Sequence, residues 1–135
     1  MSGTPSVLFV CVKNGGKSQM AAGLMSELAQ GSVEVRSAGT APGSAINDLS
    51  AESLGELGID ITREVPKPIT AQMVRSADVV IVLGNDAKVA EVEGTRFETW
   101  AVDEPSLRGI DGMERMRLVR GDIRQRVEKL LSELT

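Results

Sequence analysis

The residues best suited to chemistry lie in one short stretch near the N-terminus. The apolar run Val7–Val10 ends at Cys11, five residues follow, and then come Lys17 and Ser18. The run has the length and composition of a β-strand, and the residues after Ser18 favour a helix. A loop between strand and helix turns its backbone N–H groups toward one point, where the positive end of the helix adds to them. Such a loop can bind a tetrahedral oxyanion, and the same field favours a nucleophilic Cys11 thiolate over the thiol.

The spacing gives each loop residue an expected role. We expect the backbone of Val12, Lys13, Asn14, Gly15, Gly16 and Lys17 to surround the anion. The Lys17 cation would face the anion, and Ser18 would donate a hydrogen bond to the thiolate while capping the helix. A lone cysteine at the end of a strand is more often a small buried side chain. The combined spacing of Cys11, Lys17 and Ser18 favours catalytic chemistry over that simpler interpretation.

Composition limits the class of protein. The chain of 135 residues predicts a single domain spanning residues 1–135, with a net charge of -4 that disfavours nucleic acid as a partner. One cysteine excludes an internal disulfide and fits a reducing, cytoplasmic location; with no histidine, a metal site is not expected. No apolar run resembles a signal peptide or reaches transmembrane length, so no membrane partner is expected. Without histidine, any general acid must be a carboxyl group.

The rest of the chain alternates predicted strands and helices. Strands are expected at 7–12, 32–37, 77–83 and 95–100, and helices from residue 19 to about 30, then at 47–57, 70–75, 85–92 and 111–134. The expected helix caps are Asn47 or Ser50, Thr70, Asn85, and Asp111 paired with Glu114. In the second helix, the side chains expected to face inward are Leu49, Ser53, Leu54 and Leu57. The alternation predicts a three-layer α/β fold, a four-stranded parallel sheet with helices on both faces. Ligands bind such sheets beyond the carboxyl ends of the strands, where Cys11 is expected.

The loop resembles a known family signature. Residues 11–18 are similar to the C-x-x-N-x-x-R-S motif of the low-molecular-weight protein tyrosine phosphatases and of the arsenate reductases that share their fold. Asn14 falls on the family's asparagine, which holds the loop in a strained shape. Lys17 departs from the family's arginine, and a lysine cannot grip two oxygens as a planar fork. The segments 37–40 (SAGT) and 58–61 (GIDI) also match the family.

The segment 100–105, Trp-Ala-Val-Asp-Glu-Pro, resembles the family's W-x-x-D-x-P loop. That resemblance implies that Asp103 protonates the leaving oxygen, a role that requires a carboxyl group with a raised pKa. Taken alone, Asp103 and Glu104 are ordinary turn residues before a proline. The fourth expected strand would bring Asp103 to the same edge of the sheet as Cys11.

Two absences separate the branches of the family. The phosphatases carry a tyrosine pair near the acid loop, and this chain has no tyrosine. The thioredoxin-linked reductases carry two further cysteines after the third strand, where this chain reads Leu-Gly-Asn-Asp-Ala-Lys-Val-Ala at 83–90. A single cysteine cannot relay electrons within the molecule, so an external thiol must supply them.

The chain therefore resembles the single-cysteine branch, the arsenate-mycothiol transferases of arsenic detoxification. That resemblance implies arsenate as substrate, with phosphate or sulfate as mimics, no bound cofactor, and mycothiol as co-substrate in preference to glutathione. It also implies that a mycoredoxin or glutaredoxin-like protein releases arsenite from the thiol adduct. Arg63 and Lys67, with Lys13, are candidate residues for attracting the thiolate. Two alternatives remain open: a low-molecular-weight protein tyrosine phosphatase and a non-catalytic oxyanion-binding protein.

Overall fold

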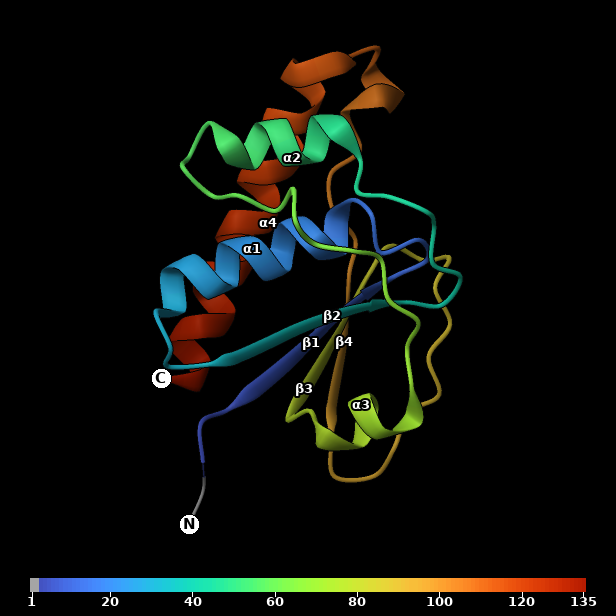
Figure 1. Ribbon diagram of the computed structural model, residues 1–135, viewed down its shortest axis with the longest axis vertical. Helices are drawn as coiled ribbons and strands as arrows, with labels where there is room; N and C mark the ends of the chain where they lie inside the picture. The colour runs from blue at the N-terminus through green and yellow to red at the C-terminus, as the bar shows by residue number, and fades with distance from the viewer. Residues whose placement is uncertain (1–2) are drawn as a thin grey trace.

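A computed structural model describes residues 3–135 and shows one sheet between two layers (Figure 1). The strands are β1 (Ser6–Cys11), β2 (Glu34–Gly39), β3 (Val79–Leu83) and β4 (Arg96–Trp100). They are parallel throughout and lie in the order β2-β1-β3-β4. The helices are α1 (Lys17–Ala29), α2 (Asp48–Gly55), α3 (Ala71–Ser76) and α4 (Gly112–Leu134), with a 3₁₀ helix η1 (Pro105–Arg108) before α4. The predicted three-layer α/β fold is confirmed.

Alternation along β1 separates the core into two parts. Val7 and Phe9 face the layer formed by α1 and α4, whereas Leu8 and Val10 face the layer that contains α3. The helix α2 packs on α1 and α4 (Figure 1). All five residues of β3 are buried, as expected for a central strand covered on both faces.

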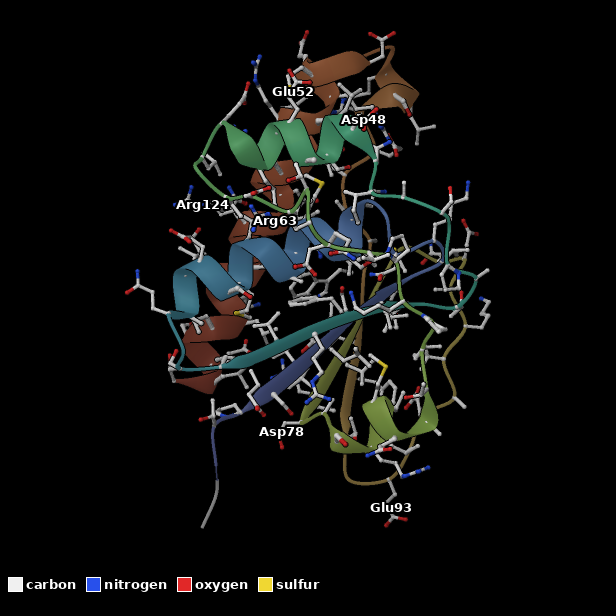
Figure 2. All side chains as sticks on the ribbon, viewed as in Figure 1. Asp48, Glu52, Arg63, Asp78, Glu93 and Arg124 are labelled. Carbon is white, nitrogen blue, oxygen red and sulfur yellow. The ribbon has the colours of Figure 1, made fainter. Side chains whose placement is uncertain are left out.

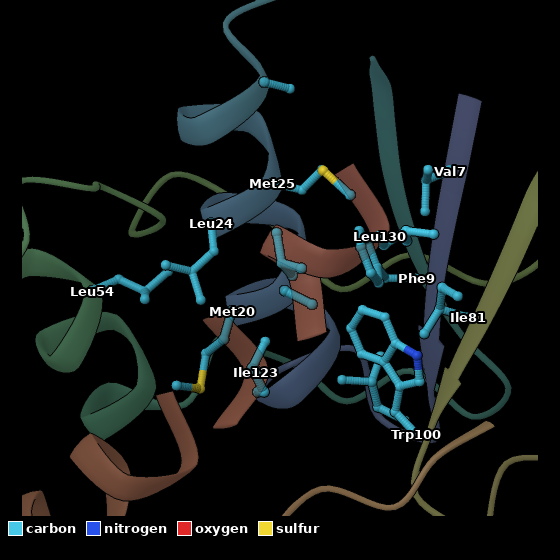
Figure 3. Close-up of a cluster of buried hydrophobic side chains, with 14 of the residues drawn as sticks. Val7, Phe9, Met20, Leu24, Met25, Leu54, Ile81, Trp100, Ile123 and Leu130 are labelled. Carbon is cyan, nitrogen blue, oxygen red and sulfur yellow. The ribbon is translucent and has the colours of Figure 1, made fainter. Parts of the chain in front are cut away.

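The ends of the strands meet at one edge of the sheet. Cys11 pairs in register with Gly39 of β2, and Leu83 of β3 pairs with Trp100 of β4. The rings of Phe9 and Trp100 pack with their centroids 5.8 Å apart (Figure 3). Because β1 and β4 are parallel and end at this edge, the segment after Trp100 leaves the sheet on the side where the loop after Cys11 lies.

Four local predictions concern helix ends. Asn47 caps α2, where its side chain accepts a hydrogen bond from the Ser50 amide, and Thr70 caps α3 in the same way through the Met73 amide. The expected side-chain cap at Asp111 is wrong, because the residue precedes α4 without making a side-chain capping bond. The expected cap at Ser18 is also wrong, because α1 begins at Lys17 and has no side-chain capping bond.

The helix expected over 85–92 is also wrong. This segment has no helical or strand hydrogen-bond pattern. Ala87, Val89 and Val92 pack against the core of the α3 layer. Their spacing of two and three residues does not place them on one helical stripe, so an irregular segment buries them instead.

Two residues expected to face inward do not. Leu49 is 37% exposed and Leu57 is 38% exposed. The buried stripe of α2 is Ser50, Ser53 and Leu54, at the helical spacing of three and four residues. Leu49 lies off this stripe and Leu57 lies beyond the end of the helix. Across residues 3–135, no helix combines the length and hydrophobicity needed to cross a membrane.

Candidate active site

The loop between β1 and α1 turns its carbonyl groups outward. The carbonyl oxygens of Cys11, Val12, Lys13 and Gly15 accept hydrogen bonds from the amides of Thr40, Ala41, Gly43 and Asn47, at 2.7 to 3.1 Å. The C=O and N–H groups of a peptide unit point in opposite directions. The N–H groups of the same peptide units, on Val12, Lys13, Asn14 and Gly16, therefore face the loop interior. Within residues 3–135 the amides of Lys13, Gly15, Gly16 and Lys17 donate to no backbone carbonyl. This arrangement, at the N-terminus of α1, has the geometry that an oxyanion-binding loop requires, and we call it the oxyanion loop.

Asn14 holds this loop in shape from inside. It is fully buried and its φ is 53°, in the left-handed region that asparagine tolerates better than most residues. Its Nδ2 donates to Ser18 Oγ at 2.8 Å. Its Oδ1 accepts from the Lys67 amide at 2.9 Å and from Gln19 Nε2 at 3.2 Å. One side chain thus joins the loop, the start of α1 and a segment 53 residues away.

Gly39 allows the end of β2 to approach the loop closely. A Cβ at this position would lie 2.6 Å from the Val12 carbonyl oxygen and 2.9 Å from Asn14 Cβ. The match at residues 37–40 therefore has a physical reason, because only glycine leaves room for the loop at this point.

The Cys11 sulfur receives two hydrogen bonds at the mouth of the loop. The Asn14 amide donates to Sγ at 3.2 Å, and Ser18 Oγ lies 2.9 Å from Sγ. Because the Asn14 side chain already donates to Ser18 Oγ, the serine hydroxyl hydrogen is free to point at the sulfur. Both donors are therefore directed at the sulfur that would act as the nucleophile. Cys11 is partly exposed, so the sulfur is not enclosed in the core.

The Lys17 side chain forms an ion pair with the carboxylate of Glu104. Lys17 Nζ lies 3.6 Å from Glu104 Oε1, and Glu104 also receives two hydrogen bonds of 2.7 Å from the Arg115 guanidinium. The hydrogen bonds from Arg115 hold the pKa of Glu104 far below its usual range. Glu104 is therefore ionised at neutral pH and links Lys17 to α4.

Comparison with known proteins agrees with this geometry. Residues 6–135 match the family described as low molecular weight phosphotyrosine protein phosphatase. The chain belongs to this family. It is 34% identical over 134 residues to the glutaredoxin arsenate reductase of Synechocystis, covering 96% of this chain and 98% of that protein.

Two solved structures place the chain beside arsenate reductases of the family. A thioredoxin-dependent arsenate reductase of Corynebacterium glutamicum is 37% identical with a TM-score of 0.83, over 98% of this chain. This chain spans 63% of the length of that reductase, less than two thirds. An arsenate reductase in the phosphate binding state is 31% identical with a TM-score of 0.84, over 97% of this chain and 99% of that one. The resemblance to the family's arsenate reductases is thus confirmed.

The segment 100–105, which we call the acid loop, was expected to carry a proton donor at Asp103. Asp103 accepts two hydrogen bonds from the Arg108 guanidinium, at 2.8 and 3.1 Å, and these bonds lower the pKa of Asp103 below its ordinary value. The raised pKa expected at Asp103 is therefore wrong. Glu104, the next residue, is the carboxylate that contacts the loop after Cys11, through its ion pair with Lys17.

The residues predicted to attract a thiol lie on the segment between α2 and α3. Arg63 is exposed there (Figure 2). Lys67 contacts the loop through its backbone, whereas its Nζ donates to the Val65 carbonyl and lies 3.9 Å from Glu64. The Lys67 charge is thus partly neutralised by its own neighbour.

Sequence reasoning missed three side chains that complete the site: Gln19, Glu104 and Arg115. Gln19 follows the signature and donates to both oxygens of Asn14. Glu104 is next to Asp103, the predicted proton donor. Side chains of neighbouring residues in an extended segment point in different directions, so the two carboxylates have different partners. Arg115 lies in the first turn of the long helix, and nothing in its local pattern distinguishes it from the other arginines of α4.

Proposed function

We propose that this protein reduces arsenate to arsenite with an external low-molecular-weight thiol, acting as an arsenate-mycothiol transferase in arsenic detoxification. The observation that carries the proposal is the single cysteine of the chain, hydrogen-bonded and partly exposed at the mouth of an oxyanion loop. No second cysteine exists in the chain to form a disulfide with it. The two electrons needed for reduction therefore come from outside the molecule.

The first step forms an arsenic–sulfur bond without a change of oxidation state. Arsenate bound by the loop amides and Lys17 loses one oxygen as water when a thiol condenses with it, and As(V) is retained in the thiol–arsenate adduct. Cys11 either forms this bond first and is then displaced by the small thiol, or orients the arsenate for direct attack. In both cases the Asn14 amide and the Ser18 hydroxyl lie within hydrogen-bond distance of the Cys11 sulfur and orient it.

The second step transfers the electrons. A second thiol attacks the sulfur of the adduct, a disulfide forms, the sulfur–arsenic bond breaks, and arsenic leaves as As(III). The total is one arsenate and two thiols giving one arsenite, one disulfide and one water. A mycoredoxin or glutaredoxin-like protein supplies the second thiol, so this chain needs to perform only the first step.

The acid loop favours this chemistry over phosphatase chemistry. A phosphatase must protonate an alkoxide leaving group, and Asp103 is held ionised by Arg108. Dihydrogen arsenate and a thiolate give the adduct and one water, so arsenate itself supplies both hydrogens and no acid on the protein is needed. The lack of tyrosine also removes the aromatic side chains that the resemblance to the phosphatases would require.

The test measures arsenite formation with mycothiol, glutathione or thioredoxin as reductant, with mycoredoxin present in the first two reactions. We expect activity with mycothiol, weaker activity with glutathione, and loss of activity to background in Cys11→Ser. The matched control Ser132→Cys, on an exposed residue near the C-terminal end of α4, should neither replace Cys11 in the Cys11→Ser background nor change the wild-type rate. Full activity with thioredoxin alone contradicts the small-thiol step, and appreciable hydrolysis of an aryl phosphate without thiol favours the phosphatase.

A further inference from the structure

We infer that the small thiol binds in a hollow between the oxyanion loop and α4, and not beside Lys67. The hollow has a volume of about 520 Å³, and its lining includes Lys13, Lys17 and Arg115. We call it the basic hollow. The inference rests on the proposed function, because a thiol co-substrate is what the hollow would bind.

Charge distinguishes the basic hollow from the hollow beside Lys67. The lining of the basic hollow carries three cations and no carboxylate. Glu104, just outside the lining, offsets one of these charges through its contacts with Lys17 and Arg115. A net positive hollow attracts a thiolate and stabilises it against the thiol.

The hollow on the Lys67 side has the opposite balance. Its lining contains two cations, Arg36 and Lys67, and three carboxylates, Glu27, Asp60 and Glu64. An approaching thiolate would meet net negative charge there. The two hollows have nearly equal volumes, about 530 and 520 Å³, so size does not choose between them and charge does.

The basic hollow adjoins the oxyanion loop. Gly15 and Gly16 of the oxyanion loop form part of its wall, so a thiol in the hollow lies against the loop that holds arsenate. Ser44 and Ala45 line its other side and are exposed, which leaves an entrance from solvent. The volume lies within the range of small-molecule sites. Asn47 and Ser50 also border the hollow, where the Ser50 amide and hydroxyl already donate to Asn47 Oδ1.

The test fills each hollow with one side chain. Ser44→Trp places an indole in the basic hollow, and the matched control Ser26→Trp does so in the hollow beside Lys67; both serines are exposed. We expect Ser44→Trp to raise the thiol KM by about tenfold or more, equivalent to about 1.4 kcal/mol, while the arsenate KM and inorganic phosphate affinity stay within about twofold. Ser26→Trp should change none of these values. A raised thiol KM in Ser26→Trp with none in Ser44→Trp overturns the inference.

A binding measurement separates this inference from the proposed function. The S-methyl derivatives of mycothiol and glutathione cannot react, and their binding to each variant is measured by calorimetry with phosphate present. Loss of binding in Ser44→Trp alone supports the basic hollow even if arsenite is never formed. Turnover with a small thiol that Ser44→Trp leaves unchanged overturns the hollow and leaves the proposed function standing.

Discussion

Replacement of Asn14 should show how the oxyanion loop is held together. In Asn14→Ala the loop loses the bond to Ser18 Oγ and leaves the Lys67 amide without its acceptor. Gln19 Nε2 keeps one partner, the Asn14 carbonyl oxygen at 3.2 Å. Three side-chain hydrogen bonds are lost in all. The bond from Gln19 is offset by its remaining partner, and the other two, at a buried site, cost about 2 kcal/mol. Alanine in the left-handed region at φ 53° adds roughly 1–2 kcal/mol, for a total near 3–4 kcal/mol.

The comparison of Asn14→Ala with Asn14→Gly separates the two terms. Glycine also loses the side-chain bonds but accepts positive φ without a steric penalty, so its loss of unfolding free energy should be about 1 kcal/mol smaller. Urea denaturation measures both variants, with the exposed Asn85→Ala as control, expected within about 0.5 kcal/mol of wild type. Equal losses in the two variants refute the backbone part of the reasoning. A loss below about 1 kcal/mol in both refutes the hydrogen-bond part.

Two further predictions test the approach of β2 and a surface ion pair. Gly39→Ala forces its Cβ against the Val12 carbonyl and Asn14, so phosphate affinity measured by calorimetry should fall about tenfold or more, whereas Gly55→Ala, which meets open space, should leave the affinity unchanged. Hydrogen bonds from Arg117 lower the pKa of Glu56 to about 2. The ionised carboxylate therefore stabilises the fold above the unfolded pKa of about 4.3 and loses this effect as pH falls toward 2. The difference in urea midpoint between wild type and Glu56→Gln should be largest above pH 5 and vanish near pH 2; a difference independent of pH contradicts the ion-pair origin.

The fold and the oxyanion loop were predictable because their signals are local. The run Val7–Val10, the apolar Val79–Leu83 and the spacing of Cys11 to Ser18 each specify an element or loop within a few residues. The cap at Asn47 was predictable for the same reason, since a cap depends on the residues of one helical turn.

The failures concern interactions that connect distant or competing residues. The segment 85–92 has a plausible cap but lacks a continuous helical stripe, and packing against the sheet decides its shape. Asp103 fits the family pattern, yet its carboxylate forms an ion pair with Arg108 of η1. Nothing in the pattern predicts this pairing. The partner of Lys17 is Glu104, 87 residues along the chain, and it depends on where β4 ends relative to the loop. Sequence periodicity contains no information about that distance.

The pairing of Lys17 bears on the residue where this chain departs from its family. An arginine would supply one positive charge in a rigid planar fork, whereas a lysine supplies the same charge on a flexible stem. Here Glu104 restrains the lysine, but a carboxylate alone would also cancel its charge. Arg115 binds the same carboxylate through two hydrogen bonds and restores one net positive charge to the group of three. The loop therefore keeps the charge that the family's arginine would provide, with the restraint supplied by the acid loop and α4. The lysine substitution is thus compatible with oxyanion binding because two residues far away in sequence accompany it.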